Sequence, residues 1–313
     1  MPRVVVDVSY GGLIPGADLV RSRARGALRG VALFVASVRA DTIAVVRTGP
    51  GWRSLLVLRA LLGRRRKLIA LHFIVFPDRS RRADRLWARV DTWAIRRALL
   101  KGAVLTSEEH DACVARYGLE AERFPLVLWP WRRERSDRLP LSPAEPRVLC
   151  SGRAFCDWPT LFAAARGTTW PLTVVCSAED LDEVRRLNAD GRAEVRSEIP
   201  APEYVELLRT ASVLAVVMQE HHVSQGHARL MDAADAGVPV VITAARALEE
   251  YLVPGETAVV VAPGDPDALR AALARLIDDP DERERMRAAV FARSHRWTGP
   301  DYLAAIGELI AAS

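Results

Sequence analysis

The feature that most limits how this chain can fold is the alternation of short apolar runs with amphipathic segments in its second half. Each run is about five residues long, which suits a strand buried on both faces. The segments between them carry helical apolar spacing, and Gly237 is placed to end one of them. We expect strands at 147–151, 172–176, 194–197, 213–217, 238–242 and 258–261, and helices at 160–165, 178–188, 202–210, 228–236, 267–277 and 281–291. Strands alternating with helices predict a parallel, doubly wound α/β sheet.

The first half has a similar but less regular pattern. We expect strands at 4–8, 43–47, 68–71 and 103–106, and helices at about 18–28, 52–62, 84–101 and 108–116. Residues 129–146 are rich in proline and charge, which is typical of a linker between domains. We therefore place one domain over 1–141 and a second over 142–293.

The distribution of charge supports this division. Residues 1–138 hold 27 basic and 13 acidic residues, a net charge of +14, whereas residues 139–313 hold 17 basic and 26 acidic residues, a net charge of −9. A basic half joined to an acidic half indicates two domains. Basic surfaces attract phosphates, nucleic acid or anionic membranes.

Other features exclude several protein classes. No apolar run approaches the roughly 18–20 residues that a membrane span needs, and the N-terminus lacks the features of a signal peptide, so we expect a cytoplasmic protein. The four cysteines form no C-x-x-C pair and have no histidine pair of zinc-ligand spacing. We interpret them as ordinary thiols: Cys113, Cys150, Cys156 and Cys176.

The most informative motif lies at 224–241, where Ser224-Gln225-Gly226 opens a helix directly after the strand at 213–217. The free N–H groups and the positive end of such a helix face the carboxyl edge of the sheet, where open α/β sheets bind ligands. Asp232 follows about one and a half turns later, and its carboxylate is suited to accept hydrogen bonds from paired ribose hydroxyls. The alternative is an ordinary helix with a solvated aspartate.

A second glycine-rich turn, at 11–16, follows the first strand. It lacks the lysine of a P-loop and does not have the G-x-G-x-x-G spacing. Gly11 and Gly12 either form a plain turn or let a substrate approach the backbone closely.

These segments resemble the glycosyltransferase family 4 type. Residues 232–240 read Asp-Ala-Ala-Asp-Ala-Gly-Val-Pro-Val where the family writes EA-x-A-x-G-x-P-V, and residues 255–265 resemble its G-x-x-G/A-x-x-V-x-P-G-D segment. Residues 224–233 and 152–161 are similar to a variant branch that writes Ser-x-Gly-Gln-Thr-Thr-Leu-Leu-Glu-Ala and Gly-Arg-x-x-Arg-Asp-Tyr-x-Thr-Leu. The resemblance is good over about 145–290 and vague before residue 100.

The resemblance implies a GT-B fold, in which two Rossmann-like doubly wound domains face each other across a cleft. A last helix within 294–313 would cross back and pack on the first domain. The implied enzyme is a hexosyltransferase-like glycosyltransferase that moves a sugar from a nucleotide diphosphate sugar to an acceptor hydroxyl, with retention. The family needs no metal, and the nucleotide sugar is a substrate rather than a cofactor. The acceptor would be lipid-linked, a saccharide or a small natural product, and nucleic acid is not expected as a partner.

The same resemblance assigns the site residues. Arg153 would hold the donor diphosphate and stabilise its departure, because a guanidinium offers a charged fork to phosphate. His72 follows a predicted strand where family members often carry a histidine near the donor sugar, although a structural role is the alternative. The donor would also be contacted by Gly152, Ser224, Gly226, His227, Ala228 and Asp232, and the acceptor side by Gly11 and Gly12.

Three departures from the family pattern accompany these assignments. The lysine that partners the diphosphate arginine is absent, and Cys156-Asp157 stands in its neighbourhood. The first glutamate of the paired motif falls at Ser224, and the second is shortened to Asp232. Two other readings therefore stay open: a different GT-B enzyme such as a nucleotide-sugar epimerase, or a non-catalytic nucleotide-binding relative that serves as a partner subunit.

A basic run from Arg79 to Lys101 interleaves with apolar residues such as Trp87 and Trp93. On a helix this spacing predicts either a core-facing helix with a solvated arginine face or a helix that lies on a membrane surface. The second reading predicts weak association with anionic membranes and a peripheral position at the inner membrane face.

Overall fold

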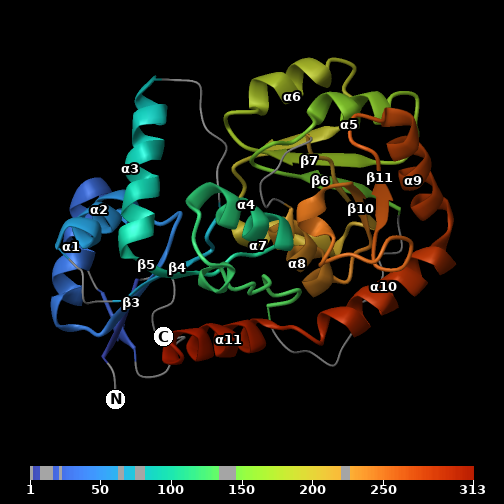
Figure 1. The fold of residues 1–313 in the computed structure, drawn as a ribbon. Coiled ribbons are helices and arrows are strands. Elements are labelled where there is room, and N and C mark those ends of the chain that lie inside the picture. The colour runs from blue at the N-terminus through green and yellow to red at the C-terminus, as the bar shows by residue number, and fades with distance from the viewer. Residues whose placement is uncertain are drawn as a thin grey trace. The chain divides into compact units, whose positions relative to one another are not determined.

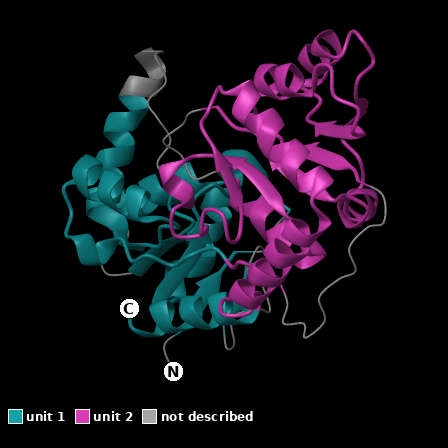
Figure 2. Ribbon diagram, turned by 90° about the vertical axis from the view of Figure 1, so that its right-hand side faces the viewer, with its two compact units in different colours: residues 1–129, 300–313 teal, residues 130–299 magenta. Residues whose placement is uncertain are grey.

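The computed structural model describes residues 3–7, 17–20, 23–62, 67–74, 82–133, 146–219 and 226–313. The chain divides into two compact units, unit 1 with residues 1–129 and 300–313 and unit 2 with residues 130–299 (Figure 2). The division precedes the expected 141/142 boundary for a physical reason. The centre of the Trp129 ring lies 4.3 Å from that of the His72 ring within unit 1. The backbone N–H of Trp131, in contrast, donates to the Trp297 carbonyl within unit 2.

Unit 1 is built on a parallel sheet of five described strands in the order β2-β1-β3-β4-β5. The strands are β1 (Val4–Val6), β2 (Asp18–Leu19), β3 (Thr42–Val46), β4 (Lys67–Leu71) and β5 (Leu99–Gly102). The helices are α1 (Gly26–Ala36), α2 (Trp52–Leu62), α3 (Arg82–Ala98), α4 (Ser107–Tyr117) and α11 (Gly299–Ala311), with short 3-10 turns η2 (Ser37–Arg39) and η3 (Ala121–Arg123). Helices α1, α2 and α3 lie over one face of this sheet, α2 packing on both neighbours (Figure 1).

Two expected elements of unit 1 are misplaced. The helix expected at 18–28 was wrong, because Asp18 and Leu19 pair with β1 as a strand and α1 begins only at Gly26. The strand expected at 103–106 lies earlier, as β5, because Thr106 is the N-cap of α4 and its hydroxyl accepts from the Glu109 N–H at 3.1 Å. Gly30 allows α1 to lie close to α2, since a Cβ there would clash with Ser54.

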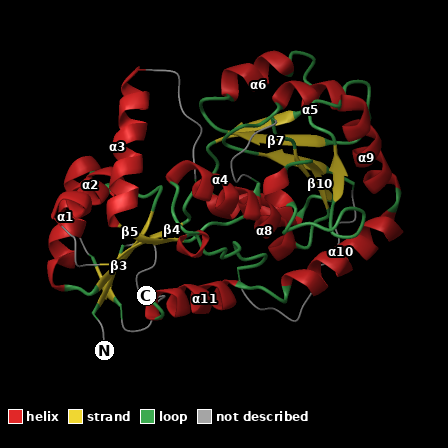
Figure 3. Cartoon of the chain, viewed as in Figure 1, coloured by secondary structure: helices red, strands yellow, loops and turns green. Residues whose placement is uncertain are grey.

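Unit 2 contains a parallel sheet of six strands in the order β11-β10-β9-β6-β7-β8, flanked by helices (Figure 3). The strands are β6 (Val148–Ser151), β7 (Leu172–Cys176), β8 (Glu194–Ser197), β9 (Val213–Val216), β10 (Val240–Thr243) and β11 (Val259–Val261). The helices are α5 (Trp158–Ala165), α6 (Leu181–Leu187), α7 (Ala201–Arg209), α8 (His227–Ala236), α9 (Pro266–Asp278) and α10 (Pro280–Ser294), with the 3-10 turn η4 (Arg246–Leu248). Both units are parallel α/β sheets, as predicted.

Local sequence explains why the helices of unit 2 begin and end where they do. Asp157, Asp265 and Asp279 each accept a hydrogen bond from the backbone N–H three residues later, which satisfies a donor that the helix cannot. Gly237 ends α8 with a φ of 65°, a conformation that glycine adopts without strain. The central strands β6, β9 and β10 are buried on both faces, whereas the edge strand β8 is half-buried to exposed, so the middle of the sheet forms the centre of the core.

Three further observations bear on the classes considered above. Among the described helices, none combines the length and apolar character that crossing a bilayer requires. The four cysteines are free thiols. No group of three side chains of metal-binding type lies together within the described ranges.

Candidate functional site

In the sheet of unit 2, the order in which the chain adds strands reverses between β6 and β9. From β6 the strands continue to β7 and β8 on one side, and from β9 they continue to β10 and β11 on the other. The loops that follow the two central strands therefore diverge and leave a crevice at the carboxyl edge of the sheet. Gly152 and Arg153 follow β6, and α8 is the first helix after β9. The two motifs singled out from the sequence thus follow the two central strands, β6 and β9, where the strand order reverses.

A cavity of about 560 Å³ lies at this edge of unit 2. This volume falls within the range of small-molecule sites. Its lining combines charged and polar side chains with aliphatic ones, which suits a ligand that has both a charged group and an apolar or aromatic group. It is lined by Arg133, Ser151, Gly152, Arg153, Val175, Cys176, Glu198, Ile199, Ala201, Tyr204, Val205, Arg229 and Asp232. Three predicted donor-site residues, Gly152, Arg153 and Asp232, are among them.

Arg153 presents an accessible cation to this cavity. Its side chain is 68% exposed, and a guanidinium nitrogen lies 3.4 Å from a carboxylate oxygen of Glu198. Such an exposed pair contributes little stability, so an incoming anion competes with it at small cost. Glu198 and Phe155 have positive φ values of 49° and 56°, although neither is glycine. Backbone strain of this kind costs about 1–3 kcal/mol and clusters at ligand sites.

Asp232 is held between two guanidinium groups. Its side chain is 7% exposed, with one oxygen paired to Arg133 and the other 3.1 Å from a nitrogen of Arg229. A carboxylate has about four lone-pair positions, so two remain for further donors such as ribose hydroxyls. Arg133 also pairs with Asp235 at 2.6 Å, and burial raises the pKa of that carboxyl. The predicted role of Asp232 in binding ribose stays a prediction.

Three of the cavity residues that sequence reasoning did not assign to the site are Arg229, Tyr204 and Arg133. Arg229 lies in the first turn of α8, at a position where the variant branch writes threonine, and its guanidinium carbon lies 4.8 Å from the centre of the Tyr204 ring. The Tyr204 hydroxyl lies 3.0 Å from the Ser151 hydroxyl. Arg133 comes from the segment that we interpreted as a linker. For Arg229 the sequence did offer a signal: it is a basic residue in the first turn of a helix, where the helix dipole disfavours it.

The N-terminus of α8 has the geometry expected of an anion site. Gly226 is the N-cap with a φ of 83°, and the first intrahelical bonds run from Arg229 and Leu230 to its carbonyl. The N–H groups of His227 and Ala228 consequently have no acceptor within the helix. The His227 side chain does not line the cavity and contacts the Ala247 carbonyl instead. Ser224 lies outside the described residues.

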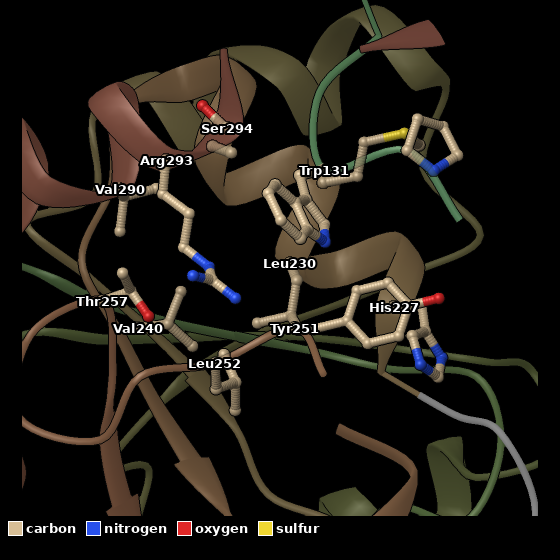
Figure 4. Close-up of a pocket in the computed structure, with 13 residues that line it drawn as sticks. Trp131, His227, Leu230, Val240, Tyr251, Leu252, Thr257, Val290, Arg293 and Ser294 are labelled. Atoms are coloured by element: carbon tan, nitrogen blue, oxygen red, sulfur yellow. The ribbon is translucent and has the colours of Figure 1, made fainter. Parts of the chain in front are cut away.

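The His227 imidazole anchors α8 to the body of unit 2. Its Nε2 lies 2.9 Å from the Ala247 carbonyl oxygen, and its ring packs against Tyr251 with 4.2 Å between ring centres (Figure 4). A carbonyl only accepts, so Nε2 carries the proton. Burial lowers the pKa of His227 from 6.5 to about 4, and the imidazole is neutral near pH 7. Together with Trp131 and Arg293, these rings line a pocket of about 40 Å³, which holds little more than a water molecule.

Cys156 and Asp157 occupy the place where the family pattern has a lysine beside Arg153. Asp157 caps α5, and a Cβ on Gly152 would clash with the sulfur of Cys156. Burial raises the pKa of the Cys156 thiol to about 12, so it carries no charge near pH 7. This stretch supplies no second cation.

The remaining predicted residues belong to unit 1. His72 lies at the carboxyl end of β4 with a φ of 49°, and its Nε2 is 2.7 Å from the Tyr302 hydroxyl of α11. Burial lowers the pKa of His72 to about 4. These contacts give the imidazole a structural role, and its predicted catalytic role stays a prediction. Gly11 and Gly12 lie outside the described residues.

The basic run before Lys101 falls mainly on α3. Two of its guanidinium groups cap carbonyls, since Arg96 donates to the Tyr117 carbonyl and Arg97 to the Ala60 carbonyl. Ala94 and Ile95 are buried against the core, whereas Trp93 is 44% exposed. One side of the helix therefore packs on the core, its contact with a membrane stays a prediction, and Arg79 lies outside the described residues.

Sequence comparisons find relatives of this chain, and the family match falls within unit 2. Residues 156–279 match the family described as Glycosyl transferases group 1, a stretch that contains α8 and Asp232. Glycogen synthase from two strains of Mycobacterium tuberculosis, CDC 1551 / Oshkosh and H37Rv, is 29% identical to the chain over 191 residues, which is 58% of this chain. The match covers 43% of each relative, so the chain spans less than half the length of these curated relatives.

Structural comparisons extend over the whole chain. Anabaena Alr3699/HepE in complex with UDP-glucose aligns over 100% of both chains with a TM-score of 0.76 and 14% identity. Sucrose-phosphate synthase from Thermosynechococcus elongatus aligns over 91% of this chain and 78% of that chain, with a TM-score of 0.70 and 20% identity. The chain has the GT-B fold. With the family match, these likenesses support a GT-B glycosyltransferase.

Proposed function

We propose that this chain transfers a sugar from a nucleotide diphosphate sugar to an acceptor hydroxyl, with retention at the anomeric carbon. One observation carries the proposal: Arg153 and Asp232 line the same cavity at the switch point of unit 2. A cation and a carboxylate in one cleft match the two polar parts of a nucleotide, its phosphates and its ribose.

The chemistry asked of the site is mainly electrostatic. When the glycosidic bond to the nucleotide breaks, negative charge grows on the departing diphosphate. Arg153 is exposed to the cavity and permanently charged, and the N-terminus of α8 adds roughly half a positive charge. Groups that are already oriented toward the developing charge lower the barrier without reorganising during the reaction.

The named relatives support a sugar nucleotide as the donor. Anabaena Alr3699/HepE was solved with UDP and with UDP-glucose, and the curated relatives are glycogen synthases. The family 4 type is part of this proposal, and it is supported by the motifs around Arg153 and Asp232.

A binding screen followed by a turnover assay tests the function. We expect UDP, GDP, TDP or ADP, or one of their sugars, to raise the melting temperature of the purified chain. The stabilising nucleotide sugar should then release its nucleoside diphosphate in the presence of an acceptor or water. Stabilisation without release over hours would favour a non-catalytic partner subunit, and conversion of the sugar into its epimer would favour an epimerase. No stabilisation at millimolar concentration would contradict the proposal.

We also propose that the chain adsorbs weakly to anionic membranes, which would bring a lipid-linked acceptor within reach. Eight of the exposed large apolar side chains in the described residues lie on the helical layer of unit 1. We call them the outer helical face: Leu28, Val31, Val35, Val38, Leu61, Leu62, Leu86 and Trp93. Between residues 23 and 62 four arginines are exposed, Arg23, Arg25, Arg39 and Arg53, and the one acidic residue is Asp41. Apolar side chains beside basic ones suit the interface of an anionic bilayer.

A further inference from the structure

The proposed donor site lacks a second cation at the place where the sequence pattern leads one to expect it. A nucleoside diphosphate carries at least two negative charges, and Arg153 shares its own charge with Glu198 at 3.4 Å. The residues after Gly152 supply a helix cap and an uncharged thiol instead of a lysine. A site for a diphosphate therefore needs positive charge from another element of unit 2.

Arg133 also lines the cavity, but it is paired with both Asp232 and Asp235, so Arg229 is the side chain that meets this need. Arg229 lines the same cavity as Arg153 and comes from the first turn of α8, one residue after Ala228, whose N–H group has no acceptor within the helix. Its side chain is 27% exposed, so it reaches the cavity while most of its length is covered. The helix dipole disfavours a basic side chain at this end of a helix, and a bound anion would offset this repulsion.

The guanidinium of Arg229 is held in place before any ligand arrives. One nitrogen lies 3.1 Å from an Asp232 oxygen, and the guanidinium carbon lies 4.8 Å from the Tyr204 ring centre. Tyr204 is fixed in turn by the Ser151 hydroxyl at 3.0 Å, at the end of β6. A guanidinium has five N–H donors in a rigid fork, so pairing with Asp232 leaves donors for phosphate oxygens.

We propose that Arg229 is the second cation of the donor site and binds the diphosphate opposite Arg153. Tyr204 and Asp232 act as positioning residues that fix its fork. This inference rests on the proposed function, because it assigns a residue to the diphosphate of that donor. Asp232 then serves both ends of the nucleotide, through Arg229 toward the phosphates and through its free lone pairs toward the ribose.

The alternative is that Arg229 only neutralises Asp232, and the two roles differ in what they do to different ligands. Calorimetry on the full chain with UDP, UMP and uridine separates them, with the GDP, TDP and ADP series in parallel. For Arg229→Gln we expect a loss of about 10- to 100-fold in affinity for the diphosphate, since a charge-assisted hydrogen bond is removed. Affinity for the nucleoside should change less than threefold. Arg229→Lys keeps the charge without the fork and should restore part of the loss.

A matched control is Arg275→Gln. Arg275 pairs with Glu282 at 3.2 Å and is about half exposed in the same unit, but it does not line the cavity. It should leave all three affinities unchanged. An equal loss for UDP and uridine in Arg229→Gln, or an unchanged affinity for UDP, would overturn this inference while leaving the proposed function standing. If the wild-type chain binds no nucleoside diphosphate, the proposed function fails and this assignment fails with it.

Discussion

At the scale of single residues, Arg153 gives the most direct test of the donor site. Its only described ion pair is the exposed contact with Glu198, so Arg153→Ala should leave the melting temperature nearly unchanged. Loss of a charged hydrogen-bond donor should lower the affinity for a nucleoside diphosphate about 10- to 100-fold. Calorimetry with the same nucleotides measures this. Glu198→Gln removes the competing carboxylate and should keep or improve the affinity. Wild-type affinity in Arg153→Ala would remove Arg153 from the site.

Asp232 is tested by the ligand's sugar rather than by its phosphates. If its carboxylate accepts from ribose hydroxyls, wild-type protein should prefer UDP to 2′-deoxy-UDP. Asp232→Asn should reduce this preference about tenfold or less, because a neutral acceptor binds more weakly than a charged one. Asp232→Glu keeps the carboxylate and should keep the preference. The ratio of the two affinities matters, because Asp232→Asn also disturbs Arg133 and Arg229. An unchanged ratio would make Asp232 a purely structural residue.

At the scale of elements, α8 is anchored by a histidine that must stay neutral. The pKa of His227 is lowered from 6.5 to about 4 by burial, so the unfolded chain binds a proton more readily than the folded one. The stabilisation is fully present above pH 6.5 and is lost as the pH falls toward 4. Between pH 7 and 5 this group alone should reduce the free energy of unfolding by about 2 kcal/mol.

Chemical denaturation of wild-type protein and His227→Gln at several pH values measures this contribution. Glutamine retains an N–H donor for the Ala247 carbonyl but does not titrate. The variant should therefore lose less stability than wild type between pH 7 and 5. His72 is shifted in the same direction and contributes in both proteins, so only the difference between the two curves is informative. A constant difference across this range would contradict the role of His227.

The same elements show what the sequence could and could not predict. Strands such as β7 and β10 followed from short apolar runs that must be buried on both faces. The helix expected at 18–28 failed because β2 exists only through its pairing with β1, which no local pattern contains. Arg153 was assigned to the same site as Asp232 through the resemblance to the glycosyltransferase family, and the structure places both in one cavity. Arg133 was missed because it reaches Asp232 from a segment 99 residues away in the chain.

At the scale of the whole molecule, apolar exposure and basic charge coincide in the first half of the chain. Residues 1–138 carry a net charge of +14, and on α1 and η2 the exposed residues Leu28, Val31, Val35 and Val38 recur at helical spacing. The opposite side of α1 buries Leu33 against the core, so the exposed stripe is a second apolar face. Of the proposed outer helical face, α1 is therefore a better candidate for membrane contact than the arginine-rich α3.

Flotation with liposomes tests this at two salt concentrations. We expect the full chain to float with anionic vesicles of phosphatidylglycerol and phosphatidylcholine at about 20 mM salt, and much less at 150 mM, where charges are screened beyond about 8 Å. Leu28→Gln with Val35→Gln should reduce binding about tenfold or more, because each buried side chain contributes about 1.5–3 kcal/mol when fully inserted. Leu126→Gln is the control, since Leu126 is 45% exposed in the same unit but lies outside the outer helical face.

Loss of binding only in Leu86→Gln with Trp93→Gln would instead assign the contact to α3. Equal flotation with neutral vesicles would rule out the electrostatic part, and no flotation at low salt would favour a soluble acceptor.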